Sequence, residues 1–539
     1  MSVDTHSKLD AALSGPEFEK RIRRRNLKDS ISRYSISAGG LGVIFAVLLI
    51  MFFLVYVVFP LFMPASIEKK TVMDLPGGGQ EQTLYYGIDE YQSTAMRFTS
   101  SGNFFGFGIE DGVVNIKDSL PINGKKVTSF TVVNEMDRVL AFALDDGSVL
   151  FAKYGYGISY PNDVRTITPE VTFPYGENTL QLADNAIENI SVRASESELL
   201  IAFREKSASL IQVKTFSVIE SMLSGSIELE EDMVGEIVTS EASKWLKIDS
   251  TGRNLYSINE TGKVSYFTIR DIENPRLIEH LSLVPSNEKP TAIRFLLGNY
   301  SLMVGTDKGN VYQWFPVRNE ENNFFLKEIR KFEISESPIQ SIGIELTRKG
   351  FAVTDEDGLF HLMHSTSERK LGDHSLVDGV NGNLITISPR ADGALVETVN
   401  GELEYFAIEN EHPDVSFNSL WGKVWYEGYE EPTYTWQSSA ADSDFEPKFS
   451  LMPLTWGTIK AALYSMLFAV PIAILAAMYT GFFMDRASRQ VVKPAVEMIE
   501  ALPTVILGFL AGLWLAPYME ANLAGFFAVL LIIPFGIIF

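Results

Sequence analysis

Few residues of this chain have the types and spacing that catalysis or metal binding requires. The 539 residues include six histidines and no cysteine, which excludes thiolate zinc sites, iron–sulfur clusters and a cysteine nucleophile. His361 and His364 lie close together, but on a strand a separation of three residues places them on opposite faces. Asp355-Glu356-Asp357-Gly358 lacks the closing glutamate of a calcium loop, so a hairpin turn is the better interpretation. The sequence predicts no catalytic residue, no metal site and no cofactor.

Two carboxylates close to an apolar C-terminal segment are the other candidates for chemistry. Glu497 and Glu500 are three residues apart and occupy neighbouring positions on a helix. Carboxylates next to lipid are usually functional or paired. Lys493 precedes Glu497 by four residues, so an interfacial ion pair is the simpler interpretation. These carboxylates would repel an anionic solute, and we do not assign them to a substrate.

Apolar segments at both ends of the chain must hold these residues in a membrane. Ile36–Met63 exceed the roughly 20 apolar residues that cross a bilayer as a helix. A basic cluster before this run places the N-terminus in the cytoplasm: Lys20, Arg21, Arg23, Arg24, Arg25, Lys28 and Arg33. A cleaved signal peptide is the alternative, but the run is too long and no small-residue cleavage site follows. The net charge of -23 argues against nucleic acid as a partner.

Later apolar runs predict three more crossings. The second span runs from about Ala461 to Met484 and ends at basic residues, which mark the cytoplasmic side. The third runs from about Ala495 to Tyr518, and a fourth begins near Leu523. We therefore expect a multi-pass protein of a bacterial inner (cytoplasmic) membrane, with residues 65–457 periplasmic.

Between the spans, alternating apolar and polar residues predict strands. One unit recurs, a strand followed by a tight turn and a second strand, with turns at Asp111-Gly112, Asp146-Gly147, Lys206-Ser207, Thr261-Gly262, Lys308-Gly309, Asp357-Gly358 and Asn400-Gly401. Such dipeptides between apolar strands are strong hairpin signals. Their spacing of roughly 35 to 60 residues is typical of propeller blades, which predicts about seven. A pair of β-sandwiches is the alternative, since strand pairs alone do not prove closure.

These patterns predict a mixed fold, with transmembrane α-helices and an all-β periplasmic domain that is a seven-bladed β-propeller. The resemblance described in the next paragraphs implies that the helices form a transmembrane α-helical permease of the ABC importer type. The expected parts are a cytoplasmic basic N-terminus (1–35), a first transmembrane helix (36–64), the propeller (65–415), an aromatic periplasmic connector (416–457) and the start of the permease domain, with about three helices (458–539).

Several segments after Leu420 occur in a distinctive order. The aromatic segment Leu420–Trp425 precedes Leu454–Thr458, and a Val-Pro pair lies within the second apolar run. Glu497–Gly508 contains a Glu, a small residue and then Pro-Thr, three apolar residues and Gly, and an Ala-Pro pair follows. This order resembles the PstC-type permease of bacterial phosphate ABC transporters over about 100 C-terminal residues plus the first span. The motif positions are Pro471, Glu497, Glu500, Pro503, Gly508 and Pro517.

The resemblance implies a permease subunit of an ATP-driven phosphate importer that forms part of the translocation path. Its partners would be membrane lipid, a second permease subunit, cytoplasmic ATPase subunits that drive translocation, and a periplasmic phosphate-binding protein. The chain has no G-x-x-x-x-G-K-[ST] motif and so no P-loop ATPase site of its own. Pro503 should kink the third span.

The chain departs from the family pattern in two ways. A propeller-sized insert fills a connection that is short in the family. The coupling helix and the phosphate-path segment should follow the fourth span, beyond Phe539, so the sequence reads as C-terminally truncated and the substrate-binding residues are unknown. A membrane-anchored periplasmic sensor or scaffold, whose propeller binds a ligand or protein, is the main alternative. A tethered quinoprotein dehydrogenase is a weaker one.

Overall fold

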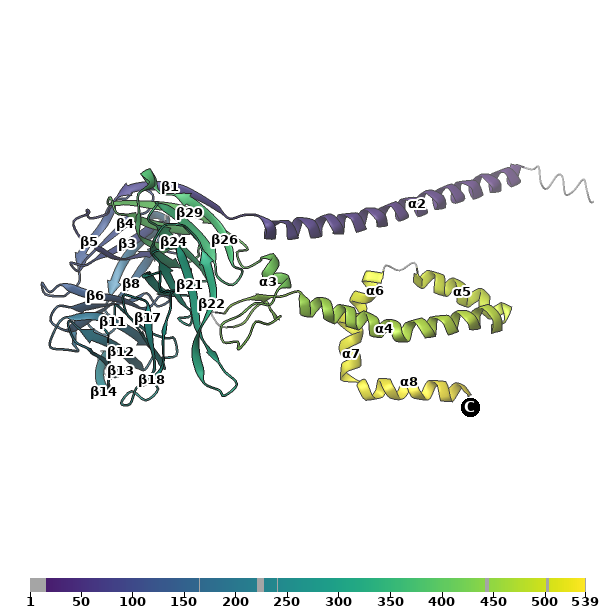
Figure 1. Cartoon of the computed structure of the whole chain (residues 1–539). Coiled ribbons are helices and arrows are strands. Elements are labelled where there is room, and N and C mark those ends of the chain that lie inside the picture. Colours follow the sequence, from purple (N-terminus) through teal and green to yellow (C-terminus); the bar gives the residue numbers. More distant parts are fainter. Residues whose placement is uncertain are drawn as a thin grey trace, which may run out of the picture. The chain divides into compact units, whose positions relative to one another are not determined.

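The computed structural model describes residues 16–163, 165–220, 227–239, 241–441, 445–500 and 504–538. The chain divides into two compact units between Met452 and Pro453. The first unit contains the strands and the second contains helices only (Figure 1). Pro503, predicted to kink the third span, lies outside the described residues.

Strands of the first unit form seven antiparallel sheets arranged as the blades of a propeller (Figure 1). In each blade the strands start from an innermost strand at the central channel and follow outward in chain order, except that β9 and β10 both pair with β8 in the second blade and β1 is outermost in the seventh. The first blade consists of β2 (Thr83–Ile88), β3 (Thr94–Thr99), β4 (Asn103–Gly108) and β5 (Val114–Ser119). The second consists of β6 (Val127–Asn134), β7 (Val139–Leu144), β8 (Ser148–Ser159), β9 (Thr166–Thr172) and β10 (Leu180–Gln181). The third consists of β11 (Ile187–Ala194), β12 (Glu198–Glu205), β13 (Leu210–Glu220) and β14 (Ile227–Val238).

Blades four to six repeat the same order. The fourth blade consists of β15 (Trp245–Ile248), β16 (Asn254–Ile258), β17 (Lys263–Thr268) and β18 (Arg276–Ser282). The fifth consists of β19 (Pro290–Phe295), β20 (Leu302–Thr306), β21 (Asn310–Arg318) and β22 (Phe324–Glu333). The sixth consists of β23 (Ile339–Ile344), β24 (Gly350–Asp355), β25 (Leu359–His364) and β26 (Arg369–Ser375). Short 3₁₀ turns, η2 (Pro161–Asp163) and η3 (Val377–Gly379), lie in loops.

The seventh blade closes the ring with strands from both ends of the domain. It contains β27 (Gly382–Ile387), β28 (Gly393–Thr398) and β29 (Glu402–Glu409), and β1 (Ser66–Asp74) pairs with β29 as the outermost strand. Lys69 Nζ on β1 lies 2.8 Å from the fully buried Glu404 carboxylate on β29. This pairing joins the two ends of the domain in one blade and so closes the ring.

Hydrophobic clusters between the blades confirm that the ring is closed. Phe98 and Met96 of the first blade pack with Phe142 of the second, and a cluster of the same kind lies between each following pair of blades. The last cluster joins Leu395 of the seventh blade to Tyr86 of the first. A pair of sandwiches would not form such a cycle, so the sequence prediction of a seven-bladed propeller is confirmed.

The hairpin turns follow the sequence prediction with one exception. Six of the seven predicted turns join the second and third strands of a blade, but Asp111-Gly112 joins β4 to β5, the third and fourth. The equivalent turn of the first blade is Ser100-Ser101-Gly102, in which Gly102 adopts φ +80°. This turn ends in Ser-Gly, whereas the Asp-Gly pair that matches the pattern lies in the next turn along the chain.

The helices account for the apolar ends of the chain. They are α2 (Pro16–Val58) with the short η1 (Phe59–Phe62), α3 (Phe417–Trp421), α4 (Met452–Met478) with a π-turn (η4, Tyr479–Phe483), α5 (Arg486–Glu500), α6 (Thr504–Leu510), the π-turn η5 (Ala511–Leu515), α7 (Ala516–Ala521) and α8 (Leu523–Ile538). Of the described residues, three helical segments are long and apolar enough to cross a membrane: Ile22–Phe62, Met452–Phe483 and Thr504–Ala521. These segments indicate a membrane protein.

The predicted third span, about Ala495 to Tyr518, covers the end of α5, which reaches Glu500, and the helices from Thr504 onward. Residues 501–503 between them lie outside the described part of the chain, so the start of this span stays a prediction. The fourth predicted span begins where α8 begins, at Leu523.

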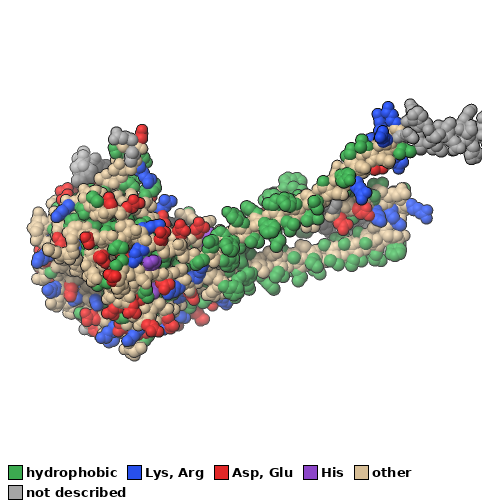
Figure 2. All heavy atoms as spheres, turned by 90° about the horizontal axis from the view of Figure 1, so that it is seen from above, with side chains coloured by type: hydrophobic (Ala, Val, Ile, Leu, Met, Phe, Trp, Pro, Cys, Tyr) green, Lys and Arg blue, Asp and Glu red, His purple; other side chains and the backbone are tan. Residues whose placement is uncertain are grey.

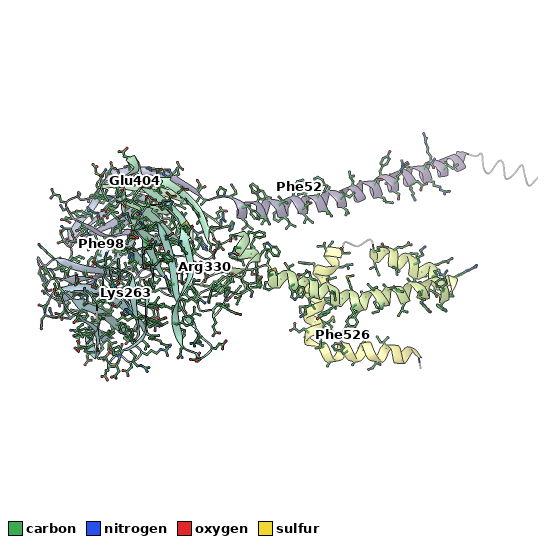
Figure 3. All side chains as sticks on the ribbon, viewed as in Figure 1. Phe52, Phe98, Lys263, Arg330, Glu404 and Phe526 are labelled. Atoms are coloured by element: carbon green, nitrogen blue, oxygen red, sulfur yellow. The ribbon has the colours of Figure 1, made fainter. Side chains whose placement is uncertain are left out.

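Surface composition differs between the strands and the helices. Hydrophobic side chains cover the long helices almost continuously, whereas the propeller shows mixed polar and charged side chains on the face seen in Figure 2. Phe52 on α2 is 71 % exposed, and Phe98 inside the propeller is fully buried (Figure 3). Helices that are apolar on all sides without internal burial need lipid or protein around them.

Candidate functional site

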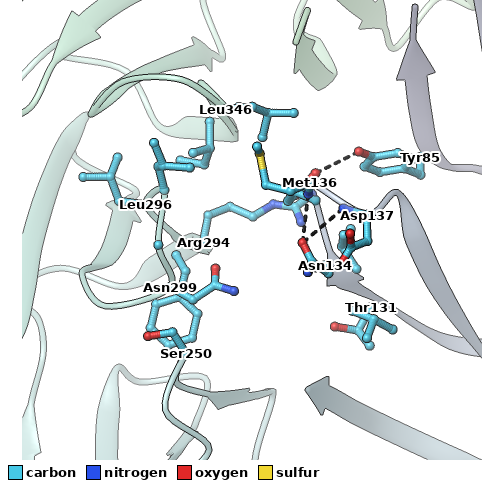
Figure 4. Close-up of a pocket in the computed structure, with 18 of the residues that line it drawn as sticks. Tyr85, Thr131, Asn134, Met136, Asp137, Ser250, Arg294, Leu296, Asn299 and Leu346 are labelled. Carbon is cyan, nitrogen blue, oxygen red and sulfur yellow. Dashed lines mark hydrogen bonds between the residues drawn. The ribbon is translucent and has the colours of Figure 1, made fainter. Parts of the chain in front are cut away.

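A cavity lies in the central channel of the propeller. It has a volume of about 560 Å³ and is lined by the innermost strands of all seven blades, β2, β6, β11, β15, β19, β23 and β27, and by the turns that follow them. Figure 4 shows part of this lining. Cavities of this size hold small molecules in many proteins.

Three neighbouring inner strands each place one basic residue in this channel. Arg193 on β11, Lys247 on β15 and Arg294 on β19 all line the cavity. The three residues occupy the same place in their blades, because each directly precedes the last residue of its inner strand. No carboxylate in the described part of the chain lies within ion-pair distance of any of the three.

The opposite part of the lining comes from the first two blades. Tyr85 Oη donates a hydrogen bond of 2.9 Å to Glu135 and lies 3.2 Å from Tyr154 Oη. Burial and then the Glu135 charge raise the pKa of Tyr85 well above its usual value, so the phenol stays protonated. Arg294 extends from β19 toward the turn that holds Asn134, Met136 and Asp137 (Figure 4).

The surroundings of Lys247 change the pKa of its ammonium group. Burial, followed by the positive charge of Arg294, lowers the pKa of Lys247 to about 8, and the more distant Glu135 opposes this only in part. A cation in such surroundings gains from any anion that enters, because the anion relieves both the desolvation and the repulsion.

A second polar site lies where the connector packs on the propeller. Glu427 accepts hydrogen bonds of 2.6 Å from Lys349 Nζ and 2.5 Å from Ser301 Oγ. Lys349 is 3 % exposed and also donates to the Leu297 carbonyl at 2.6 Å. Burial raises the pKa of Glu427, Lys349 opposes that shift, and Glu446 adds to it. Removing one member of such a pair leaves a buried charge without a partner.

Further contacts extend this attachment over the fifth and sixth blades. Arg330 Nη2 donates to the Trp425 carbonyl at 2.7 Å, and Arg369 Nη1 donates to the Val415 carbonyl at 2.7 Å. Lys448 lies over the rings of three connector aromatics, Tyr426, Tyr429 and Phe445. Two short strands, β30 (Trp436–Gln437) and β31 (Lys448–Phe449), complete the segment. The connector therefore belongs to the same compact unit as the propeller.

The histidines that stood out in the sequence have structural partners. His361 Nε2 lies 3.1 Å from Asp355, and His364 Nδ1 lies 3.0 Å from Ser367 Oγ. Burial, then the charges of Arg348 and two other arginines, lowers the pKa of His364 to about 3. Asp357-Gly358 forms the turn between β24 and β25, as predicted. Among the described residues no group of three metal-ligating side chains occurs.

The residues that carry the permease resemblance lie on separate helices. Pro471 is inside α4, Gly508 is in α6, and Pro517 is in the first turn of α7, directly after the π-turn. A proline lacks the N–H of a regular turn, which accounts for the widened turn before it. Glu497 lies 3.9 Å from Lys493 and both are exposed, and Glu500 ends α5. The roles of these residues remain predictions.

Comparison with known proteins supports a limited relationship. No protein-family model matches the chain. The chain is 26 % identical over 77 residues to the "Probable ABC transporter permease protein YqgH" of Bacillus subtilis (strain 168), which is 14 % of this chain and 25 % of that protein. The chain thus matches about a quarter of the length of this curated relative. The similarity is a weak, partial homology to an ABC transporter permease.

Solved structures resemble the propeller only loosely. A crystal structure of Raptor from Chaetomium thermophilum matches with a TM-score of 0.42 and 10 % identity over 65 % of this chain and 29 % of that one. The β-propeller domain of Cps50 (Swd1) from Myceliophteria thermophila matches with the same TM-score and identity over 64 % of this chain and 99 % of that one.

Sequence analysis missed the channel cations and the buried pair of the connector. Each channel cation is a single basic residue in an apolar strand. That the three residues belong together is seen only when the inner strands of the three blades are aligned with one another. The pair between Lys349 and Glu427 joins residues 78 positions apart, so no local pattern marks it.

Proposed function

We propose that this chain is a permease subunit of an ATP-driven importer, with phosphate as its solute, in a bacterial inner membrane. The observation that carries the proposal is the partial similarity to an ABC transporter permease, together with three helices of membrane-spanning length. The order of the motif residues from Leu420 to Pro517 supports phosphate as the solute.

In this proposal the chain supplies one half of a translocation path and a second permease subunit supplies the other. Cytoplasmic ATPase subunits drive the cycle, since the sequence carries no P-loop. The exposed apolar faces of α4, α6 and α8 fit the need for lipid and for neighbouring helices. A π-turn and a proline in the third span provide the irregular helix that permeation paths favour.

The propeller is proposed to dock the periplasmic phosphate-binding protein above the path. Its support is the fixed attachment of the connector, because Leu451 N donates to the Leu420 carbonyl at 2.8 Å directly before α4 begins.

Uptake of radiolabelled phosphate tests the proposal. Cells that lack this gene should lose uptake at micromolar phosphate and regain it when the full chain is restored, and sulfate uptake serves as the control. A chain from which residues 66–451 are deleted should restore uptake only at high phosphate, because the docking surface is missing. Unchanged phosphate uptake in the gene-deleted cells would refute the proposal.

The channel favours a second candidate, a membrane-anchored sensor whose propeller binds a ligand. The observation that favours a sensor is the 560 Å³ cavity lined by three basic residues. A sensor would leave phosphate uptake intact in the gene-deleted cells and would change the expression of other genes instead, which separates the two candidates.

A further inference from the structure

The basic residues of the channel form one group on one side of the ring. In register, Arg193 pairs with Leu200, Lys247 with Tyr256 and Arg294 with Met303, each a residue of the second strand of its blade. The corresponding inner-strand positions in the sixth, seventh and first blades are Gly343, Thr386 and Gly87, which pair with Ala352, Leu395 and Met96. Among the described residues that line the cavity, positive charge is therefore confined to blades three, four and five.

Carboxylates that line the same cavity are already engaged elsewhere. Asp249 accepts hydrogen bonds from the backbone N–H groups of Arg253 and Asn254, which fixes the turn after β15. Asp137 accepts from Asn134, and Glu135 accepts from Tyr85. None of these carboxylates forms an ion pair with a channel cation among the described residues.

Unpaired cations at this depth have an energetic cost without a ligand. Arg193 donates through Nε to the Ser250 carbonyl at 2.5 Å, but its guanidinium has further donors for a second acceptor. Like charges on adjoining strands repel each other, and the channel walls reduce the screening by water. An anion between these side chains would remove the repulsion and supply acceptors together.

We propose that the central channel of the propeller binds a small oxyanion ligand, held by Arg193, Lys247 and Arg294. This site is separate from the permease helices and goes beyond the proposed function. It does not depend on the solute that the helices carry.

The chemistry of the three side chains defines the ligand class. The planar guanidinium of an arginine pairs with two oxygens of a phosphate or a carboxylate, and a lysine adds a compact charge. A volume of 560 Å³ exceeds the space that a bare inorganic ion fills, so an organic phosphate or a polycarboxylate fits the channel best. Glu135, which faces the channel, selects against ligands with negative charge on all sides.

Calorimetric titration of the full chain in detergent, at constant ionic strength, tests the site. The probes are inorganic phosphate, glycerol 3-phosphate, citrate and sulfate, with uncharged glycerol as the control. At least one oxyanion should bind saturably. Arg294→Gln and Lys247→Met should each weaken that binding by roughly 10- to 100-fold, the effect of losing one charge-assisted contact. If inorganic phosphate is the only probe that binds, the ligand of the site is the free ion. If glycerol 3-phosphate binds more tightly, the ligand is an organic phosphate.

Two further variants separate loss of the site from loss of the fold. Arg276→Gln removes an exposed charge from β18 of the same blade as Lys247 and should leave binding unchanged. Glu135→Gln keeps an acceptor for Tyr85 but removes the negative charge, so it should strengthen binding. Without ligand, Lys247→Met should unfold at no lower temperature than the parent chain, because a repelled cation is gone.

The pH dependence provides an independent readout. The charges of Arg294 from β19 and Glu135 from the β6–β7 turn act on Lys247, and Tyr256 of β16 pairs with it in register. Arg193 from β11 lines the same cavity. Because the pKa of Lys247 is about 8, affinity should fall between pH 7 and 9 in the parent chain and much less in Lys247→Arg. The proposal is overturned if no oxyanion binds below about 10 mM, a limit that corresponds to under 3 kcal/mol, or if binding is equal in the parent chain and both channel variants.

Discussion

The propeller and the C-terminal helices place their apolar side chains in opposite environments. In the propeller, seven clusters of buried residues join the blades into one ring. On α4 no described residue is buried, and Phe468 is 69 % exposed. The propeller thus buries its hydrophobic residues by itself, whereas the exposed apolar helices need lipid or protein around them.

A Phe→Ala substitution in each region should give the largest difference in stability between the propeller and the helices. Phe98→Ala removes a ring from the cluster between the first two blades and should destabilise the propeller by about 3–5 kcal/mol. Phe468→Ala removes a ring that contacts only detergent and should leave propeller unfolding unchanged. Thermal unfolding of the full chain in detergent measures both. Equal losses would show that the two regions are not independent.

The connector should behave as part of the propeller and not as part of the helices. Lys349→Ala leaves the buried Glu427 without its cation and should lower the free energy of unfolding by about 3 kcal/mol. Lys493→Ala breaks an exposed pair with Glu497 and serves as the matched control, with no expected change. Limited proteolysis after Tyr429 should accelerate in the first variant only. If it does not, the connector is held by other contacts.

Propeller stability should depend on pH through Glu345. Burial raises the pKa of Glu345 to about 7, although Arg348 Nε donates to its carboxylate at 3.1 Å. The folded protein therefore holds this proton between pH 4.5 and 7 while the unfolded chain releases it, so stability falls as pH rises through this interval.

Glu345→Gln should remove that dependence. At pH 8 the variant should be more stable than the parent chain by on the order of 2 kcal/mol, and at pH 4.5 the two should unfold alike. Urea titrations at both pH values, with Glu336→Gln as an exposed control, provide the comparison. A variant that is less stable at pH 8 would show that the pair with Arg348 outweighs the cost of burial.

The smallest predicted effect concerns the one hairpin turn of the regular series that lacks glycine. Ser207 adopts φ +64°, a region that glycine occupies without strain. Ser207→Gly should stabilise the propeller by up to about 1 kcal/mol. The reverse change at the equivalent position, Gly147→Ala, should destabilise it, because a Cβ would lie 2.2 Å from the Ala183 carbonyl oxygen. Chemical denaturation measures both.

Local patterns explain what the sequence predicted correctly. Alternating strands and Gly-containing turns are properties of neighbouring residues, and they gave the blade type and number. Closure by β1 and β29 joins Ser66 to Glu409 across the whole domain, so no local pattern revealed it. The same holds for the channel cations, which only the ring brings together. In the tail, hydropathy located the long apolar helices, because a run of apolar residues is itself a local pattern.

Membrane topology is the claim on which the proposed role of both regions depends, and the chain offers a clean test because it contains no cysteine. Ser101→Cys places a single thiol on an exposed turn of the propeller, and Ser488→Cys places one on the exposed basic segment after the second span. Intact spheroplasts are treated with a membrane-impermeant maleimide. We predict that the propeller thiol reacts at once and that the Ser488→Cys thiol reacts only after the membrane is permeabilised. Labelling of Ser488→Cys in intact spheroplasts, or protection of Ser101→Cys, would contradict a propeller on the outer face joined to helices that cross the bilayer.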